Sequence, residues 1–199
     1  MGTTERRVRE REEKRRLILE AARELFLKEG FESVTMRRIA ERIEYSPMAL
    51  YQYFPKKEML LAELCNETFA GLTRKLVRME AEPGDPLTKL KKGLRIYIAF
   101  GIAHPHDYIL TFMTLTPPGS LEATSGPGRE AFACLERGVR ICVDAGLIHL
   151  PMREAAEVLY AGIHGLTALL ITRREFFETR QNRLIDLTVE TLVAGLNSP

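Results

Sequence analysis

Apolar residues recur every three to four positions along nearly the whole chain, and no alternation of polar and apolar residues is long enough to predict a strand. Within residues 12–29 this spacing places six apolar side chains on one helical face: Leu17, Ile18, Ala21, Ala22, Leu25 and Phe26. Gly30 follows directly and is expected to end that helix in a left-handed conformation. The spacing therefore predicts an all-α fold.

Two shorter helices are expected after this first one. Thr35 can accept a hydrogen bond from the first turn of a helix over residues 36–43, and Ser46 followed by Pro47 can open another over residues 47–53. Three short helices thus fit between residues 12 and 54.

The rest of the chain predicts longer helices separated by turn-forming residues. Asp85 and Pro86 are suited to cap the helix that follows the sequence EPGDP, and Gly146 separates two further helices. The segment TPPGSLEATSGPG, over residues 116–128, is expected to be a mobile loop. The other helices expected here cover residues 56–81, 87–104, 107–115, 151–177 and a last segment that carries apolar residues from 184 to 196.

The composition excludes disorder and gives the two parts of the chain opposite charge. Of the 199 residues, 45% are apolar and 28% are charged, which is enough to bury a core. Residues 1–57 hold 14 basic and 10 acidic side chains, whereas residues 58–199 hold 15 basic and 17 acidic ones. A basic first part suits a domain that faces DNA phosphates.

Several segments exclude other classes of protein. The charged start, MGTTERRVREREEKRR, is not followed by an apolar core, so we expect no secretory signal peptide and a cytoplasmic location. Polar residues interrupt the apolar segment 151–177, which predicts a helix buried on two sides and no membrane partner. Cys65, Cys134 and Cys142 lack the spacing of a zinc site and are expected to be small buried residues.

Two short helices joined by about four residues form a helix-turn-helix, whose second helix enters the major groove of DNA. Here that helix begins at Pro47, and Gln52 near its end could pair bidentately with adenine. The other side chains expected to face base edges are Tyr45, Ser46 and Ala49, and Pro47 is also expected to contact the DNA. The side chains expected to hold phosphates are Thr35, Arg37, Arg38, Tyr51, Tyr53, Lys56 and Lys57.

These residues also carry a resemblance to a known family. Its DNA-binding signature is matched in order by Gly30-Phe31, Val34-Thr35, Ile39-Ala40, Ser46, Leu50-Tyr51, Tyr53-Phe54, and Lys57 with Glu58 and Leu60. Over residues 12–64 the chain resembles the TetR/AcrR family of transcriptional regulators. The resemblance implies an N-terminal three-helix DNA-binding domain over residues 1–60 and a C-terminal helical domain over residues 61–199 for effector binding and dimerisation. It also implies that Leu50 and Phe54 pack the second helix of the motif onto Leu25 and Ile39.

The chain departs from the family pattern in the turn of the motif. Ile43-Glu44 replaces the usual Ala-Gly, and Pro47-Met48 stands where smaller or polar residues are commoner. If Glu44 adopts the left-handed conformation of the usual glycine, it costs roughly 1 kcal/mol and places an acid near DNA.

Aromatic, methionine and histidine side chains of the C-terminal domain are candidates for the walls of an effector pocket, although ordinary core packing accounts for them as well. These candidates are Phe69, Phe100, His104, Tyr108, Phe112, Met113, Tyr160 and His164. A metal site at His104 and His106 is not favoured, because no carboxylate or thiol is spaced to complete it, and no cofactor is expected. The motifs GxSxG and HExxH and a Walker glycine loop do not occur, so we expect no enzyme.

The last helix carries an apolar stripe on a body that already has enough helices to close its core. The stripe includes Leu192 and Leu196 and is expected to face a second copy of the chain in a homodimer. The favoured function is a repressor that binds double-stranded operator DNA and is released by a small, largely apolar effector. The alternative is a helix-turn-helix protein controlled by a protein partner.

The charged arm over residues 5–16 has two interpretations as well. It is either a solvated helix end or an extension that contacts phosphates or the minor groove.

Overall fold

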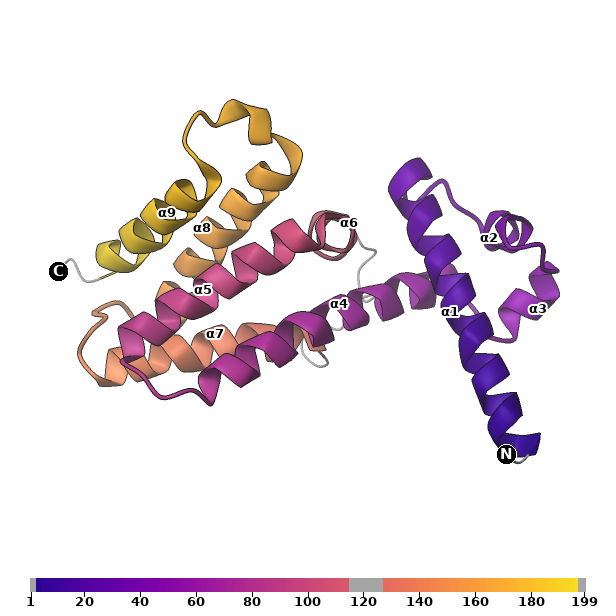
Figure 1. Ribbon diagram of the computed structural model, residues 1–199, viewed down its shortest axis with the longest axis horizontal. Helices are drawn as coiled ribbons and strands as arrows, with labels where there is room; N and C mark the ends of the chain where they lie inside the picture. Colours follow the sequence, from indigo (N-terminus) through magenta and orange to yellow (C-terminus); the bar gives the residue numbers. More distant parts are fainter. Residues whose placement is uncertain (1–2, 115–126, 197–199) are drawn as a thin grey trace. The chain divides into compact units, whose positions relative to one another are not determined.

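The computed structural model describes residues 3–114 and 127–196, and no strand occurs among them (Figure 1). The first helices are α1 (Thr3–Glu29), α2 (Met36–Arg42), α3 (Pro47–Tyr51) and α4 (Lys57–Glu80). They are followed by α5 (Pro86–Ala103), α6 (Pro105–Tyr108), the π-helical turn η1 (Ile109–Met113), α7 (Pro127–Asp144), α8 (Met152–Thr172), the 3-10 turn η2 (Arg174–Phe176) and α9 (Gln181–Gly195). The predicted all-α fold is confirmed.

Contacts divide the chain into two units. The first, called the head below, comprises the described parts of residues 1–67 and 109–121, and the second, called the body, comprises those of residues 68–108 and 122–199. Helix α4 is continuous and belongs to the head up to Glu67 and to the body from Thr68. Of the loop expected over residues 116–128, residues 116–126 lie outside the described part, and Pro127 and Gly128 begin α7.

Local sequence signals set the ends of the short helices in the head. The Thr35 hydroxyl accepts a hydrogen bond from the Arg38 N–H at 3.1 Å, and the Ser46 hydroxyl accepts one from the Ala49 N–H at 3.2 Å. Both predicted N-caps are therefore confirmed. Gly30 follows α1 with a φ of 83°, the left-handed conformation that the sequence predicted.

Two of the predicted boundaries in the head were wrong. Helix α1 begins at Thr3 rather than near residue 12, so the charged arm is helical. Helix α3 ends at Tyr51, two residues early, and the N–H groups of Tyr53 and Phe54 both donate to the Leu50 carbonyl. The packing expected for the motif is consistent with the burial of Leu25, Ile39, Leu50 and Phe54, of which none is more than 4% exposed.

The body is built around α5 and α8, which contact each other and both of the helices α7 and α9. Gly101 of α5 permits a close approach: a Cβ atom there would lie 2.4 Å from Cγ2 of Thr167 and 2.8 Å from Cδ2 of Tyr108. Helix α8 is long and apolar enough to cross a membrane by length and composition alone. It contacts three neighbouring helices, but only 39% of its most apolar stretch is buried, which is less than the burial on two sides that the sequence predicted.

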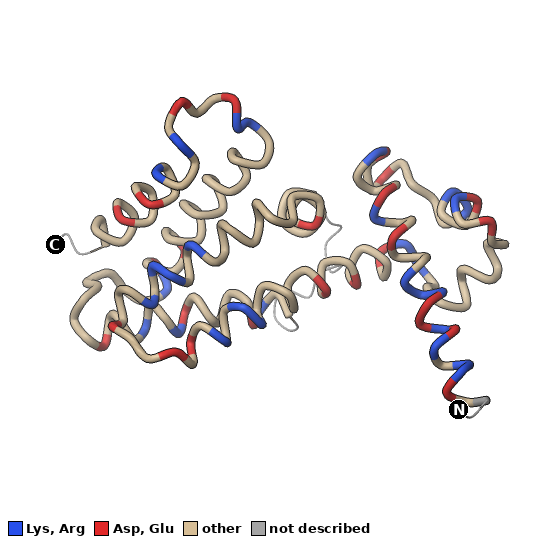
Figure 2. Tube along the Cα trace, viewed as in Figure 1, with Lys and Arg blue, Asp and Glu red and all other residues tan. Residues whose placement is uncertain are grey.

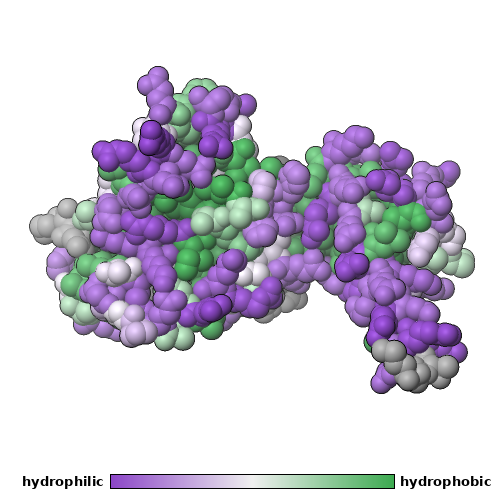
Figure 3. Space-filling model, in the orientation of Figure 1, coloured by the Kyte–Doolittle hydropathy of each residue, from purple (hydrophilic) through white to green (hydrophobic). Residues whose placement is uncertain are grey.

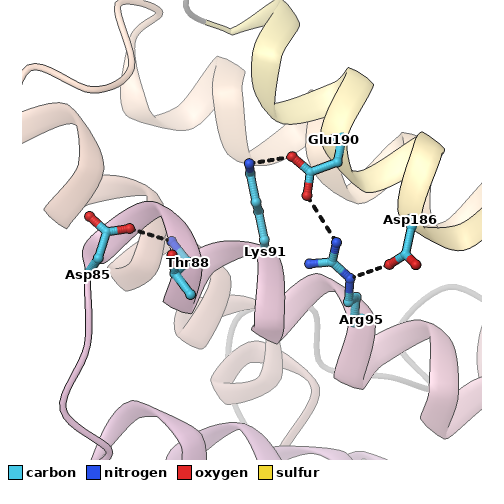
Figure 4. Close-up of polar contacts among 6 residues, drawn as sticks. All are labelled: Asp85, Thr88, Lys91, Arg95, Asp186 and Glu190. Atoms are coloured by element: carbon cyan, nitrogen blue, oxygen red, sulfur yellow. Dashed lines mark hydrogen bonds and ion pairs between the residues drawn. The ribbon is translucent and has the colours of Figure 1, made fainter.

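Ion pairs tie α9 to α5 (Figure 4). Arg95 donates from Nε to Asp186 at 2.8 Å and from Nη2 to Glu190 at 3.0 Å, and Lys91 also binds Glu190. Exposed pairs of this kind add little stability, but they favour one register of α9 along the body.

The cysteines are buried, as predicted. Burial raises the pKa of the Cys65 and Cys134 thiols to about 11, so both stay protonated at neutral pH.

Candidate DNA-binding and effector sites

Helix α3 is anchored by one residue and presents the others. Leu50 is fully buried, whereas Ser46, Pro47 and Gln52 are exposed and Tyr51 is 50% exposed. Tyr45, Ala49 and Tyr53 are partly exposed. The structure thus brings the side chains expected to read bases together with Tyr51 and Tyr53 on and around one short helix.

Met48 is a candidate contact that the sequence reasoning left out. It lies on α3 beside Pro47 and is 76% exposed, more than nearly all the other large apolar side chains described. An apolar side chain on a recognition helix can contact the methyl group of thymine. The sequence does indicate this contact, because Met48 is the second residue of the helix and directly follows the cap and Pro47.

The arginines near α2 are exposed and paired with glutamates. Arg37 donates to Glu41 at 2.9 Å, and Arg38 donates to Glu29 at 3.2 Å. Exposed pairs are weak, so a phosphate can take the place of either glutamate at small cost. Thr35, whose hydroxyl caps α2, and Lys56, just before α4, are also exposed.

Lys57 is held by the backbone of the head. Its ammonium donates to the carbonyls of Phe31 at 2.7 Å, Glu32 at 3.1 Å and Val34 at 3.1 Å, and it lies 4.4 Å from the centre of the Phe31 ring. These bonds occupy all three donors of the ammonium. The direct phosphate contact expected of Lys57 stays a prediction, and the geometry supports a positioning role, in which Lys57 fixes the turn that leads to Thr35.

Glu44 takes the left-handed conformation, with a φ of 59°. The chain therefore keeps the backbone turn that glycine normally supplies, and this conformation of Glu44 costs roughly 1 kcal/mol of strain. The Tyr45 N–H donates to the Ala40 carbonyl at 2.9 Å, which closes the turn between α2 and α3.

In the body, the structure brings together Tyr108, Tyr160 and His164 with Tyr97, which the sequence reasoning missed. The Tyr108 hydroxyl lies 2.7 Å from Nδ1 of His164 and 3.0 Å from the Tyr97 hydroxyl. The Tyr160 ring stacks on His164 with centroids 5.7 Å apart and meets the Tyr97 ring edge-on at 6.1 Å. These four residues are called the tyrosine–histidine cluster below.

Burial keeps the tyrosine–histidine cluster uncharged at neutral pH. It raises the pKa of Tyr108 to about 12 and raises the pKa values of Tyr97 and Tyr160, because a phenolate loses its hydration inside the protein. The same loss of hydration lowers the pKa of His164. The cluster offers hydroxyl and imidazole groups that donate and accept hydrogen bonds without a net charge.

The other predicted effector residues lie outside this cluster. Phe69 of α4 lies against Gly128 of α7, and the Phe100 ring lies tilted against His104 with ring centroids 4.8 Å apart. His104 is exposed at the end of α5. Phe112 and Met113 belong to η1, which is part of the head.

Two family models match the chain. One, described as bacterial regulatory proteins of the tetR family, matches residues 18–64, and the other, described as a tetracyclin repressor-like C-terminal domain, matches residues 90–193. The chain belongs to the TetR family. This TetR-family protein is a DNA-binding transcriptional regulator and not an enzyme, as the sequence predicted.

Curated relatives match over shorter stretches. YuxN, an HTH-type transcriptional regulator of Bacillus subtilis (strain 168), is 32% identical over 84 residues, which are 42% of this chain and 29% of YuxN. The HTH-type transcriptional repressor KstR of Mycolicibacterium smegmatis is 36% identical over 78 residues, which are 39% of this chain and 38% of KstR. The matches thus span well under half the length of these relatives.

A solved structure matches nearly the whole length of the TetR-family chain. The fatty acid degradation regulator FadR of Bacillus halodurans gives a TM-score of 0.77 over 94% of this chain and 97% of FadR, at 18% identity. This likeness concerns the fold alone.

Proposed function

We propose that this TetR-family regulator is a cytoplasmic repressor that binds a palindromic operator as a homodimer and leaves it when a small, largely apolar effector binds the body. The observation that carries the DNA-binding part is α3: a capped helix held by the buried Leu50, with its remaining side chains exposed. Repression is supported by the relative KstR, which is a transcriptional repressor. We assign DNA binding to residues 1–60 and the effector and dimer functions to residues 61–199.

On the operator, base edges are read by Tyr45, Ser46, Ala49 and Gln52, and Pro47 and Met48 also contact the DNA. Phosphates are held by Thr35, Arg37, Arg38, Tyr51, Tyr53 and Lys56, and Lys57 acts by positioning the turn before Thr35. A single α3 buries too little surface for useful specificity, so two copies should bind half-sites one or more helical turns apart.

A gel shift or footprint with the purified protein and the DNA upstream of its own gene tests DNA binding. Replacing Tyr51 and Lys56 with alanine should weaken binding to every duplex and lower the salt dependence, because phosphates are common to all sequences. Gln52→Ala should weaken only the cognate operator. Unchanged operator binding by the folded Tyr51→Ala, Lys56→Ala variant would contradict the assignment.

The homodimer is proposed to form through the exposed apolar face of α8 and α9. Val158 and Leu169 are each 46% exposed on α8, and Leu187 is 47% exposed on α9. Leu192 and Leu196 were both expected on this face, and the expectation is wrong for Leu196, which is 2% exposed. Leu192 lies against Gly162, where a Cβ atom would be 2.6 Å from its Cδ1, but its side chain is partly exposed and stays a proposed dimer contact.

The dimer proposal is tested by charge placed on the exposed face. Leu169→Glu should give monomers with weakened operator binding, since it would bury a carboxylate without a partner in each copy. The control is Ile141→Glu on α7, where the side chain is 54% exposed and the same charge should leave the dimer intact. Sedimentation that shows wild-type monomers at micromolar concentration would refute the dimer.

For the effector, the tyrosine–histidine cluster supports a ligand that is mostly apolar with an uncharged polar group. Charged groups would gain no opposite charge from Tyr97, Tyr108, Tyr160 or His164, whereas a hydroxyl or carbonyl finds partners among them. Phe69, Phe100 and His104 of the body remain proposed effector contacts.

Release from DNA requires the effector to favour one state of the regulator. A hundredfold loss of operator affinity corresponds to about 2.7 kcal/mol of differential binding, and operator DNA must then weaken effector binding by the same factor. Helix α4 belongs to both the head and the body, and it is proposed to transmit the influence of the effector to the DNA-binding helices. Tyr108→Phe should blunt induction while leaving operator binding of the ligand-free protein unchanged, and a bound effector without influence on operator affinity would contradict the proposal.

A further inference from the structure

The first turns of α1 carry a cationic face that continues the helix's buried face. Ile18 and Ala22 are fully buried, and the described residues from Thr4 to Lys14 are all exposed. At 3.6 residues per turn, Lys14, Arg11 and Arg7 lie in line with Ile18 toward the N-terminus. The face of α1 that holds the core of the head therefore changes from apolar to basic.

The opposite side of the same turns has a different charge balance. Arg9 and Arg16 point there, and so do Glu5, Glu12 and Glu13. The helix thus separates its charges: one side is basic, while the other mixes both signs. A merely solvated helix end needs no such separation, since either arrangement keeps it in water.

The basic side lies beside the end of the recognition helix. Arg7, Glu10, Arg11 and Lys14 of α1 line an open groove of about 370 Å³ together with Gln52 and Tyr53. Figure 2 shows Lys and Arg along this part of α1, and Figure 3 shows that its visible surface is hydrophilic.

The basic groups of this groove are available to a ligand. Glu10 is its one acidic lining residue and is paired with Arg6 at 3.4 Å. No ion pair among residues 3–114 and 127–196 involves Arg7, Arg11 or Lys14. A polyanion that already contacts Gln52 and Tyr53 would meet three cations at once.

We propose that Arg7, Arg11 and Lys14 bind the phosphate backbone of operator DNA next to the segment that α3 reads. The proposal rests on the DNA-binding function above and adds a second contact region to it. From Arg7 to Lys14 the helix rises about 10 Å, which equals about three base pairs along the duplex axis. Because only phosphates are contacted, this region strengthens binding to every sequence and contributes to the salt dependence.

The test compares two variants of equal charge in the full-length protein. Arg7→Ala with Arg11→Ala removes two cations from the basic side, and Arg9→Ala with Arg16→Ala removes two from the other side. Binding to a labelled duplex from the gene's own upstream region is measured between about 50 and 200 mM salt. Because each dimer loses four cations, the first variant should lower the slope of log affinity against log salt by about 3.6 and weaken binding at least about tenfold, whereas the second should change the slope by under about 0.5.

Duplex length gives a second readout. Duplexes that end at the outer edges of the α3 half-sites are compared with duplexes that are longer by six base pairs on each side. Wild type and the Arg9, Arg16 variant should bind the longer duplex more tightly, and the Arg7, Arg11 variant should bind both equally. Equal losses of DNA affinity in the two variants would overturn this contact region alone. So would tight binding of an acidic peptide to the wild type if the peptide leaves DNA affinity unchanged. A wild type that binds no upstream duplex would overturn the DNA-binding function with it.

Discussion

The head and the body of this regulator build their sites in opposite ways. In the head, the groups around α3 come from one stretch of about twenty residues, and side-chain caps and one left-handed residue set the helix ends. In the body, the tyrosine–histidine cluster joins α5, α6 and α8, and its hydrogen bonds connect residues as far apart as Tyr97 and His164. The head's site depends on local backbone geometry, and the body's site depends on how closely helices pack.

This difference separates the changes that each region tolerates. A DNA-reading motif set by local geometry should respond to substitutions in its turns and caps, with little effect on the body. A polar cluster assembled by packing should respond to added volume at a helix crossing. The following substitutions test that contrast.

The largest effect is expected at the crossing of α5 and α8. Gly101→Ala should lower the free energy of unfolding of the body by about 3 kcal/mol, because the new methyl group overlaps Thr167 and Tyr108 and forces the helices apart. Gly138→Ala on α7 is the control, since its Cβ atom would lie at an ordinary 3.5 Å from Leu90. Chemical denaturation measures both variants, and equal stability of the two would show that packing does not position the cluster.

A smaller effect is expected at the start of α4. Lys57→Met keeps the aliphatic stem but should cost the head about 2 kcal/mol, because three backbone carbonyls lose their charged donor. Lys56→Met should leave stability unchanged and lower only DNA affinity and its salt slope. Thermal unfolding and anisotropy titrations distinguish the two lysines, and a stable Lys57→Met protein with a lowered salt slope would restore the direct phosphate contact.

A substitution in the turn of the motif should raise the stability of the head. Glu44→Gly should stabilise the head by about 1 kcal/mol, because it relieves a left-handed conformation that glycine adopts without strain. It should also strengthen DNA binding by removing an acid. Glu44→Gln is the matched variant: it removes the charge and keeps the strain, so it should raise DNA affinity without raising stability. If Glu44→Gly and Glu44→Gln unfold at the same temperature, backbone strain does not matter at this turn.

The smallest effect is a pH dependence in the body. The pKa of His164 is lowered by burial, so below its ordinary value of 6.5 the unfolded chain takes up a proton that the folded chain does not. The free energy of unfolding should therefore fall slightly as the pH drops from 7 toward 5. The His164→Phe variant should show a shallower dependence over the same range, and identical slopes would show that His164 titrates as freely as in the unfolded chain.

The sequence by itself determined the all-α fold and the DNA-binding motif. Thr35, Ser46 and Gly30 act through bonds and torsions within four residues, so their roles follow from neighbours that the sequence already shows. The buried face of α1 and the anchor Leu50 likewise follow from helical spacing.

Only the tertiary structure decided which side chains meet across the chain. Tyr97 looks like any buried aromatic residue in the sequence, and its bond to Tyr108 exists because Gly101 lets the helices approach. Lys57 was expected to hold a phosphate, and the fold places carbonyls from the preceding turn around it. Gly162 likewise leaves room for Leu192 on the neighbouring helix, a contact that helical spacing alone does not show. Spacing identifies the face of a helix, but the partner of that face depends on packing between distant segments.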